Sequence, residues 1–231
     1  QTRRVEKLAT AVGEAAPFSI EIVQPKMPLV QNGTMNLKVV AKRNEGFTAP
    51  INLRTLWMPG GVSAGTADIP EGGAEAAIFM NANGGAAAGT FRVAVIGTSV
   101  GYTVSTALTP IMVAAPWVTF DVATAETEQG KPAQLKVTVN QQHDYAGSFN
   151  AELLGLPKGC TTAPLQFSHE TTEMIFPIEI AADAPVGKFG NLFVRAVIQA
   201  EGEDVLHQWG GGTLQVFAPL PPAAAPAPAP A

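Results

Sequence analysis

Residues 173–180 read EMIFPIEI, and apolar side chains occupy every second position of this stretch, namely Met174, Phe176, Ile178 and Ile180. Successive side chains of a β-strand point to opposite sides, so a period of two indicates a strand that buries one face. The same alternation occurs 98 residues earlier, in the stretch EAAIFMNA at residues 75–82. The chain therefore predicts strands rather than helices at both places.

These two stretches are parts of an internal repeat. A shift of 98 residues superimposes two copies without a gap over roughly 55 positions. Matched positions include Leu37 with Leu135, Pro59 with Pro157, Gly89 with Gly187 and Val62 with Cys160. Because apolar residues fall on the same face in both copies, we predict that the copies share one strand register.

The rest of the chain follows the same pattern of short apolar strands and polar turns. Alternating runs such as FSIEIV, QLKVTV and LFVRAVI are separated by turn residues, as in QNG, LPKG and ADAPVG. This arrangement predicts an all-β protein made of two tandem immunoglobulin-like β-sandwich domains. The predicted parts are an N-terminal segment or remnant of a preceding domain (1–16), domain 1 (17–115), domain 2 (116–218) and a Pro/Ala-rich linker (219–231).

Composition excludes several classes of function. The net charge of -5, the charged fraction of 14% and the scattered Lys and Arg residues argue against a nucleic-acid surface. A single cysteine forms neither an internal disulfide nor a Cys-rich zinc site. No apolar run approaches the roughly 20 residues of a transmembrane helix. The chain begins at Gln1 without a signal peptide, which indicates a processed product or a fragment.

The stretch LLGLPKGCTT at residues 153–162 holds the cysteine, Cys160, and His169 follows it. A Cys/His nucleophile is one interpretation, since a thiolate needs a nearby base. However, Cys160 matches Val62 in the first copy, so we expect a buried structural residue. His169 matches Glu71 in a polar turn, and no G-x-S-x-G motif occurs. We therefore expect no enzyme, no catalytic residues and no cofactor.

Two groups of polar residues are candidate binding sites. His143, Asp144 and Tyr145 form either a polar cluster or a loop in which the tyrosine covers the end of the core, and the second interpretation is favoured. The acidic residues of EGED (201–204) and of FDVATAETE (120–128) lack the regular spacing of a calcium loop. We interpret EGED as a solvated hairpin turn and predict no metal site.

Aromatic residues are the remaining candidates for a ligand site, because sugars stack on flat rings. Trp57 matches Gly155, so the fold does not require a large side chain there. We take Trp57 and Trp209 as candidate ligand-binding residues, with a plug over the open end of the sandwich as the alternative for Trp57. Trp117 matches Phe18 and is expected in the core or between the domains.

The turns GLPKG (155–159) and ADAPVGKF (182–189) resemble those of bacterial immunoglobulin-like and fibronectin-like sandwich modules. The first copy keeps MPGGV and AAAGTF but lacks the proline of the second turn. The stretch at residues 24–53 is similar to repeats of large exported proteins of planctomycete-type bacteria, which often carry pre-peptidase C-terminal domains. This resemblance implies an exported protein that is extracellular, periplasmic or attached to the cell surface.

Two functions are compatible with these observations. The first is a non-catalytic structural or adhesive spacer of a secreted or cell-surface multidomain protein, with neighbouring domains of the same polypeptide as its partners. The alternative is a pair of carbohydrate-binding modules that uses exposed tryptophans on cell-envelope polysaccharide. Exposed sheet edges also allow assembly with like chains.

Overall fold

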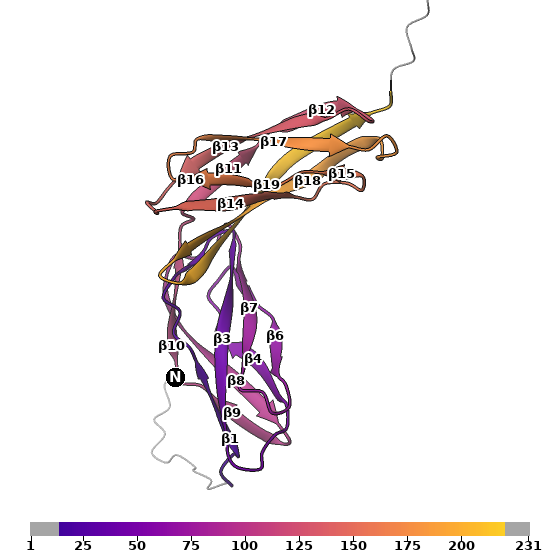
Figure 1. Cartoon of the computed structure of the whole chain (residues 1–231). Coiled ribbons are helices and arrows are strands. Elements are labelled where there is room, and N and C mark those ends of the chain that lie inside the picture. Colours follow the sequence, from indigo (N-terminus) through magenta and orange to yellow (C-terminus); the bar gives the residue numbers. More distant parts are fainter. Residues whose placement is uncertain (1–13, 220–231) are drawn as a thin grey trace, which may run out of the picture.

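The computed structural model describes residues 14–219, and this range consists of 19 β-strands joined by turns, with no helix (Figure 1). The predicted segments 1–16 and 219–231 lie almost entirely outside this range. The all-β prediction is confirmed, because alternating burial within the strands separates a core face from a solvent face, as in the pattern eBeBeBeB of Glu173–Ile180.

We call β1 to β10 the first sandwich. Its two sheets run β1-β3-β7-β5 and β2-β10-β8-β4-β6, with β9 paired to β8. The strands are β1 (Phe18–Ile22), β2 (Leu29–Val30), β3 (Gly33–Arg43), β4 (Ile51–Leu56), β5 (Val62–Ala64), β6 (Thr66–Ile69), β7 (Glu75–Ala82), β8 (Gly89–Ser99), β9 (Tyr102–Ser105) and β10 (Thr109–Ala114).

We call β11 to β19 the second sandwich. Its sheets run β11-β13-β17-β15 and β16-β14-β18-β19, with β12 paired to β19. The strands are β11 (Val118–Val122), β12 (Thr124–Glu128), β13 (Ala133–Gln141), β14 (Ser148–Leu154), β15 (Cys160–Thr161), β16 (Leu165–Ser168), β17 (Glu173–Ile180), β18 (Gly187–Ala200) and β19 (Glu203–Phe217).

In both sandwiches the first two strands belong to different sheets, so the chain crosses from one sheet to the other between them. In the first, β1 pairs antiparallel with β3, and the following β2 pairs parallel with β10. In the second, β11 pairs antiparallel with β13, and β12 pairs parallel with β19. Two packed sheets that are antiparallel apart from these parallel pairs form the immunoglobulin-like arrangement that the sequence predicts.

The strand register confirms the repeat residue by residue. Val62 lies opposite Ala82, and Cys160 lies opposite Ile180, which is the same pair displaced by 98 positions. Leu37 opposite Ile78 likewise corresponds to Leu135 opposite Phe176. An ion pair also recurs, since Lys38 contacts Glu75 at 2.7 Å and Lys136 contacts Glu173. The repeat is thus a repeat of pairing and not only of composition.

Each sandwich has its own hydrophobic core. Leu37, Ile51 and Ile78 are fully buried in the first, and Leu135 and Phe176 are fully buried in the second. Burial of a large apolar side chain stabilises a fold by about 1.5–3 kcal/mol. These two cores supply the main driving force for the folding of the two sandwiches.

The two sandwiches also share one sheet, which the sequence did not predict. Near its start, the strand β19 pairs with β18 on one side and with β3 on the other, so that the order β16-β14-β18-β19-β3-β7-β5 forms one hydrogen-bonded sheet. In Figure 1 the β18–β19 hairpin, in the yellow part of the chain, leaves the second sandwich and reaches the first. The sandwiches meet at a bend at this point (Figure 1).

Candidate functional site at the joint between the sandwiches

The joint is built by the tip of the β18–β19 hairpin. Its turn residues Glu201 and Gly202 have positive φ angles of 50° and 80°, as a two-residue type I′ turn requires. The turn joins Ala200 to Glu203, which lie opposite each other, and the two strands remain paired down to the tip. The hairpin therefore projects as a stiff two-stranded arm.

Backbone pairing attaches this arm to the first sandwich. Leu206 lies opposite Thr34, His207 lies opposite Gly33, and the Gln208 N–H donates to the Asn32 carbonyl at 2.7 Å. A Cβ at Gly33 would lie 2.3 Å from the Leu206 carbonyl oxygen. Only glycine permits so close an approach of the two strands, so Gly33 is a requirement of the joint.

A carboxylate reinforces the attachment. Glu203 Oε2 accepts hydrogen bonds from the backbone N–H groups of Lys26 and Met27, at 2.9 Å each. Hydrogen bonds to an ionised acceptor are stronger than neutral ones. The predicted solvated turn at EGED is correct for the exposed Glu201 and Gly202 but wrong for Glu203, because Glu203 binds the first sandwich.

His207 lies fully buried at the centre of the joint. Its Nε2 accepts a hydrogen bond from the Trp117 backbone N–H at 3.0 Å, so the ring is neutral with its proton on Nδ1. No residue between 14 and 219 forms a hydrogen bond with Nδ1. Burial lowers the pKa of His207 to about 4. The backbone of Val205 opposes this shift, because hydrogen bonding to it would favour the protonated ring.

Apolar contacts complete the joint. Val30 of the first sandwich is buried in the core of the second, and Trp117 is 8% exposed there. The Trp117 ring stacks on His143 with centroids 4.9 Å apart. The position of Trp117 agrees with its expected role in core or interdomain packing. A hollow of about 490 Å³ lies beside these residues, lined by Met27, Met112, Ala115, Pro116 and others.

The two candidate tryptophans have different surroundings. Trp57 is 69% exposed and has a φ of +55°, a left-handed conformation that is costly for a bulky residue. Its counterpart Gly155 also has a positive φ, of 84°. Trp209 is half-buried, pairs with Val194 and packs against the second core. The structure does not bring the two indoles together into one site, and a ligand role for either stays a prediction.

Cys160 is buried in the second core, as its alignment with Val62 predicts, and burial raises the pKa of its thiol. A raised pKa opposes formation of the nucleophilic thiolate. His169 pairs instead with Asp144, Nε2 to Oδ1 at 3.1 Å. The two residues of the Cys/His hypothesis therefore have separate surroundings.

The segment His143–Tyr145 combines both interpretations that the sequence left open. Tyr145 packs on Phe149 and Phe167 over the core, and its hydroxyl donates to Gln141 Oε1 at 2.8 Å. Asp144 and His169 add a polar cluster above it. Within residues 14–219, no group of three or more His, Cys, Asp or Glu side chains is arranged to hold a metal ion.

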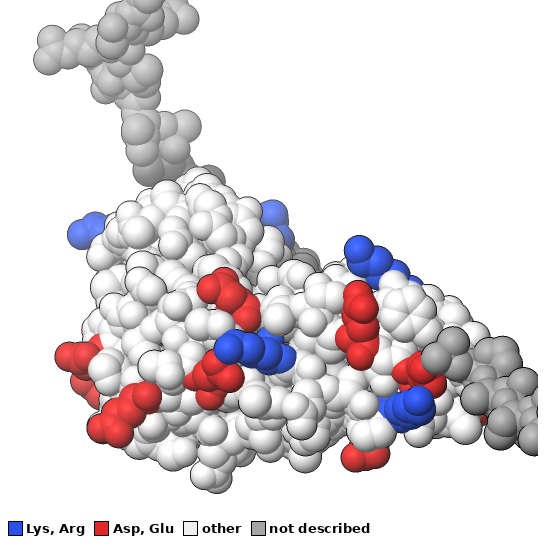
Figure 2. All heavy atoms as spheres, turned by 90° about the horizontal axis from the view of Figure 1, so that it is seen from above, with Lys and Arg blue, Asp and Glu red and all other residues white. Residues whose placement is uncertain are grey.

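Charged side chains are sparse on the face seen in Figure 2, where acidic and basic groups are interspersed. They do not gather there into a patch of one sign. In the described part of the chain, no helix has the length and apolar character needed to cross a membrane.

Comparisons with known proteins give likenesses of overall structure only. No protein-family model and no curated protein matches the chain. The chain is similar to the D0-D1 domain of intimin, with 12% identity, a TM-score of 0.29 and coverage of 85% of this chain and 97% of that one. A protein of unknown function from Porphyromonas gingivalis W83 shows 9% identity, a TM-score of 0.29 and coverage of 87% and 100%. The Yersinia pseudotuberculosis adhesin InvE shows 12% identity, a TM-score of 0.30 and coverage of 82% and 58%.

Proposed function

We propose that this chain is a non-catalytic structural unit that holds two sandwich modules at a fixed angle. The observation that carries the proposal is the joint, in which β19 pairs with β3 and Glu203 binds the backbone of Lys26 and Met27. Domains joined by a linker alone move relative to each other, whereas shared backbone pairing and buried apolar contacts restrict such motion.

The cellular setting of this unit comes from the resemblance of its turns to exported bacterial modules. In this proposal, residues 17–115 and 116–218 are the two modules, and they act as a spacer or adhesive segment of an exported multidomain protein. The partners are neighbouring domains of the same polypeptide. Its location is the cell surface, the periplasm or the extracellular medium.

Distance measurement by pulsed electron spin resonance tests the fixed angle. Spin labels are attached at Thr103→Cys on β9 and Glu179→Cys on β17, which are both exposed, in a Cys160→Val background. We expect one narrow distance distribution, and we expect Glu203→Ala to broaden it. A broad distribution in the protein with the intact joint would refute the proposal.

Carbohydrate binding is the second candidate, and one observation favours it. Trp57 keeps a large ring exposed in a strained backbone conformation, and such strain is often retained for function. Co-sedimentation with insoluble polysaccharides and with cell envelope, compared for wild type, Trp57→Ala and Trp209→Ala, tests this function. Retention that one substitution abolishes would support it, and wild-type protein that stays in the supernatant throughout would contradict it.

A further inference from the structure

The arm that forms the joint also opens a fork in the sheet of the second sandwich. The ladder between β14 and β18 joins residues Ala151–Leu154 to Phe193–Ala196 and ends at the pair of Ala151 and Ala196. Beyond it, β14 continues to Ser148 along β16, while β18 continues to Ala200 along β19. Figure 1 shows the two strands diverging there, as the hairpin turns toward the first sandwich.

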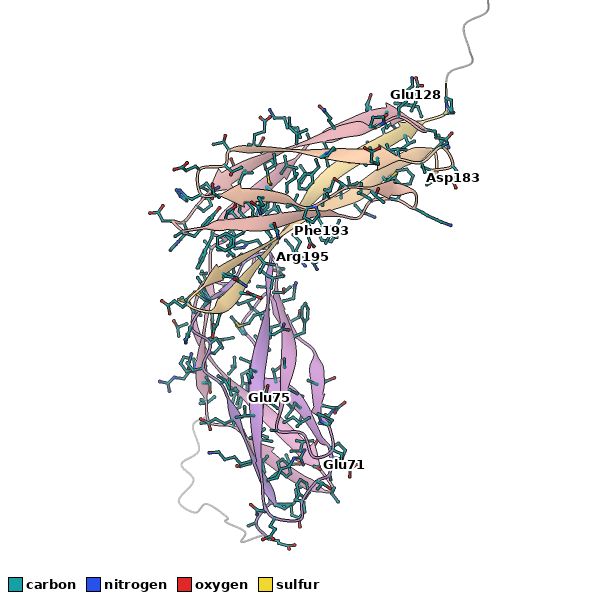
Figure 3. The ribbon with its side chains drawn as sticks, in the orientation of Figure 1. Glu71, Glu75, Glu128, Asp183, Phe193 and Arg195 are labelled. Atoms are coloured by element: carbon teal, nitrogen blue, oxygen red, sulfur yellow. The ribbon has the colours of Figure 1, made fainter. Side chains whose placement is uncertain are left out.

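A hollow of about 420 Å³ occupies this fork. Its walls are mainly outward-facing side chains of β14, β16, β18 and β19, because each of these strands places alternate residues on this side of the sheet, and Phe149, which packs against the core, also lines it. Figure 3 shows Arg195 and Phe193 near the closed end of the fork, on the side of the second sandwich that faces the first. The lining includes the amides of Asn150, Gln166 and Gln199 and the apolar side chains of Val197 and Leu206.

The fork has no net charge and many hydrogen-bonding groups. Among the described residues that line it, the one cation is Arg195, whose Nη2 contacts Glu152 Oε2 at 2.5 Å, so the two charges compensate each other. The remaining polar side chains are amides and a serine hydroxyl, above an apolar floor that includes Val197 and Leu206. A complementary ligand is therefore uncharged at the point of contact, hydrogen-bonding and partly apolar.

The fork also presents two strand edges without ladder partners. Residues 148–150 of β14 and residues 197–200 of β18 each pair on one side only, and no backbone hydrogen bond within residues 14–219 spans the gap. Natural edges are usually protected by lysine, proline or a bulge. These two edges, with sequences SFN and VIQA, contain none of these protective features.

We propose that the fork binds an extended polypeptide segment of another protein, which adds as a short strand to these edges. Main-chain groups of the segment would pair with a free edge over about three or four residues, and its uncharged side chains would contact the amides and the apolar floor. Two free backbone edges favour a peptide over a glycan, which would use the side chains alone. The site goes beyond the spacer role, since the joint would remain rigid if the fork bound nothing.

A library of random decapeptides displayed on phage tests the proposal on the full chain. Selected peptides are synthesised, and their dissociation constants are measured for wild type, Asn150→Lys, Gln199→Lys and Gln134→Lys. The first two place a charge at the free edges, and Gln134→Lys places the same charge at an exposed position of β13 outside the fork. Circular dichroism and thermal melting establish that all four proteins are folded.

We expect peptides that bind wild type with micromolar affinity, and we expect each fork variant to weaken binding at least tenfold while Gln134→Lys leaves it unchanged. Backbone amide resonances of residues 197–200 should shift on binding. The proposal is overturned if no peptide is enriched, or if the fork variants bind as well as Gln134→Lys. A glycan array in which Gln199→Lys abolishes binding, without any peptide ligand, would also overturn it and indicate a carbohydrate site.

Discussion

Acidification should lower the unfolding free energy of the protein, because it protonates His207. The imidazole is fully buried, and its Nε2 accepts the Trp117 N–H at 3.0 Å. Protonation would turn this acceptor into a donor that faces another donor, inside an apolar joint that does not solvate the new charge. Burial accordingly lowers the pKa of His207 from 6.5 to about 4.

The sign and size of the effect follow from linkage. Because the pKa is lower in the folded state, the unfolded chain takes up the proton first as the pH falls. The contribution of His207 to the unfolding free energy is fully present above pH 6.5 and is lost as the pH falls toward 4. Well below pH 4 this group causes no further change. A difference of about 2.5 pKa units corresponds to roughly 3 kcal/mol of unfolding free energy.

Urea unfolding at pH 7, 5.5 and 4, monitored by circular dichroism, measures this loss in wild type and in His207→Gln. The glutamine keeps a hydrogen-bond acceptor but does not titrate, and the carboxyl groups titrate in both proteins. We expect wild type to lose about 3 kcal/mol more than the variant between pH 7 and pH 4. Equal losses in the two proteins would refute the assignment of this effect to His207.

Three further predictions concern stability and are checked by denaturant or thermal unfolding. Gly33→Ala should lower the unfolding free energy by about 1–3 kcal/mol, because its Cβ would lie 2.3 Å from the Leu206 carbonyl oxygen, whereas Gly60→Ala, with open space around its Cβ, should have little effect. Trp57→Gly should raise the unfolding free energy by about 1 kcal/mol, because the native φ of +55° suits glycine, and an unchanged or lower value would contradict this reasoning. Cys160→Ala should lower it by about 1–2 kcal/mol through a small cavity, whereas Cys160→Val should be nearly neutral, since Val62 occupies the equivalent position; equal losses in both variants would argue against that equivalence.

The parts of the fold that the sequence predicted depend on local alternation and on the repeat. Alternating residues in 173–180 specify a strand that is buried on one face, and the shift of 98 residues, which matches Cys160 with Val62, predicts that Cys160 is a buried structural residue. Both features depend on neighbours within one sandwich. A feature of one copy therefore predicts the equivalent feature of the other.

The joint was not predicted because its contacts connect segments that no repeat relates. Glu203 lies 177 residues from Lys26 along the chain. The composition of EGED is also that of an ordinary solvated turn, so it does not indicate that Glu203 makes a contact with the other sandwich. His207 in HQWGGG has no other histidine at the spacing of a metal site, so nothing in the sequence singles it out. The structural register places Gly33 on Lys131, because the Gln31 and Gln129 N–H groups, 98 residues apart, make equivalent hydrogen bonds to Ala114 and Phe217. Gly33 leaves room for the Leu206 carbonyl in the first sandwich.

The difference between Gly33 and Lys131 means that only the first sandwich can receive a hairpin arm in this way. The second sandwich has an edge equivalent to the one that receives the arm, at the start of β13. There Lys131 replaces Gly33 and pairs with Glu128 at 2.7 Å, and Pro132 replaces Thr34. A side chain at position 131 would lie where Gly33 leaves space for the arm, and proline has no N–H for a ladder. The second sandwich donates a hairpin but cannot accept one in the same way, so the repeated fold does not imply a repeated joint.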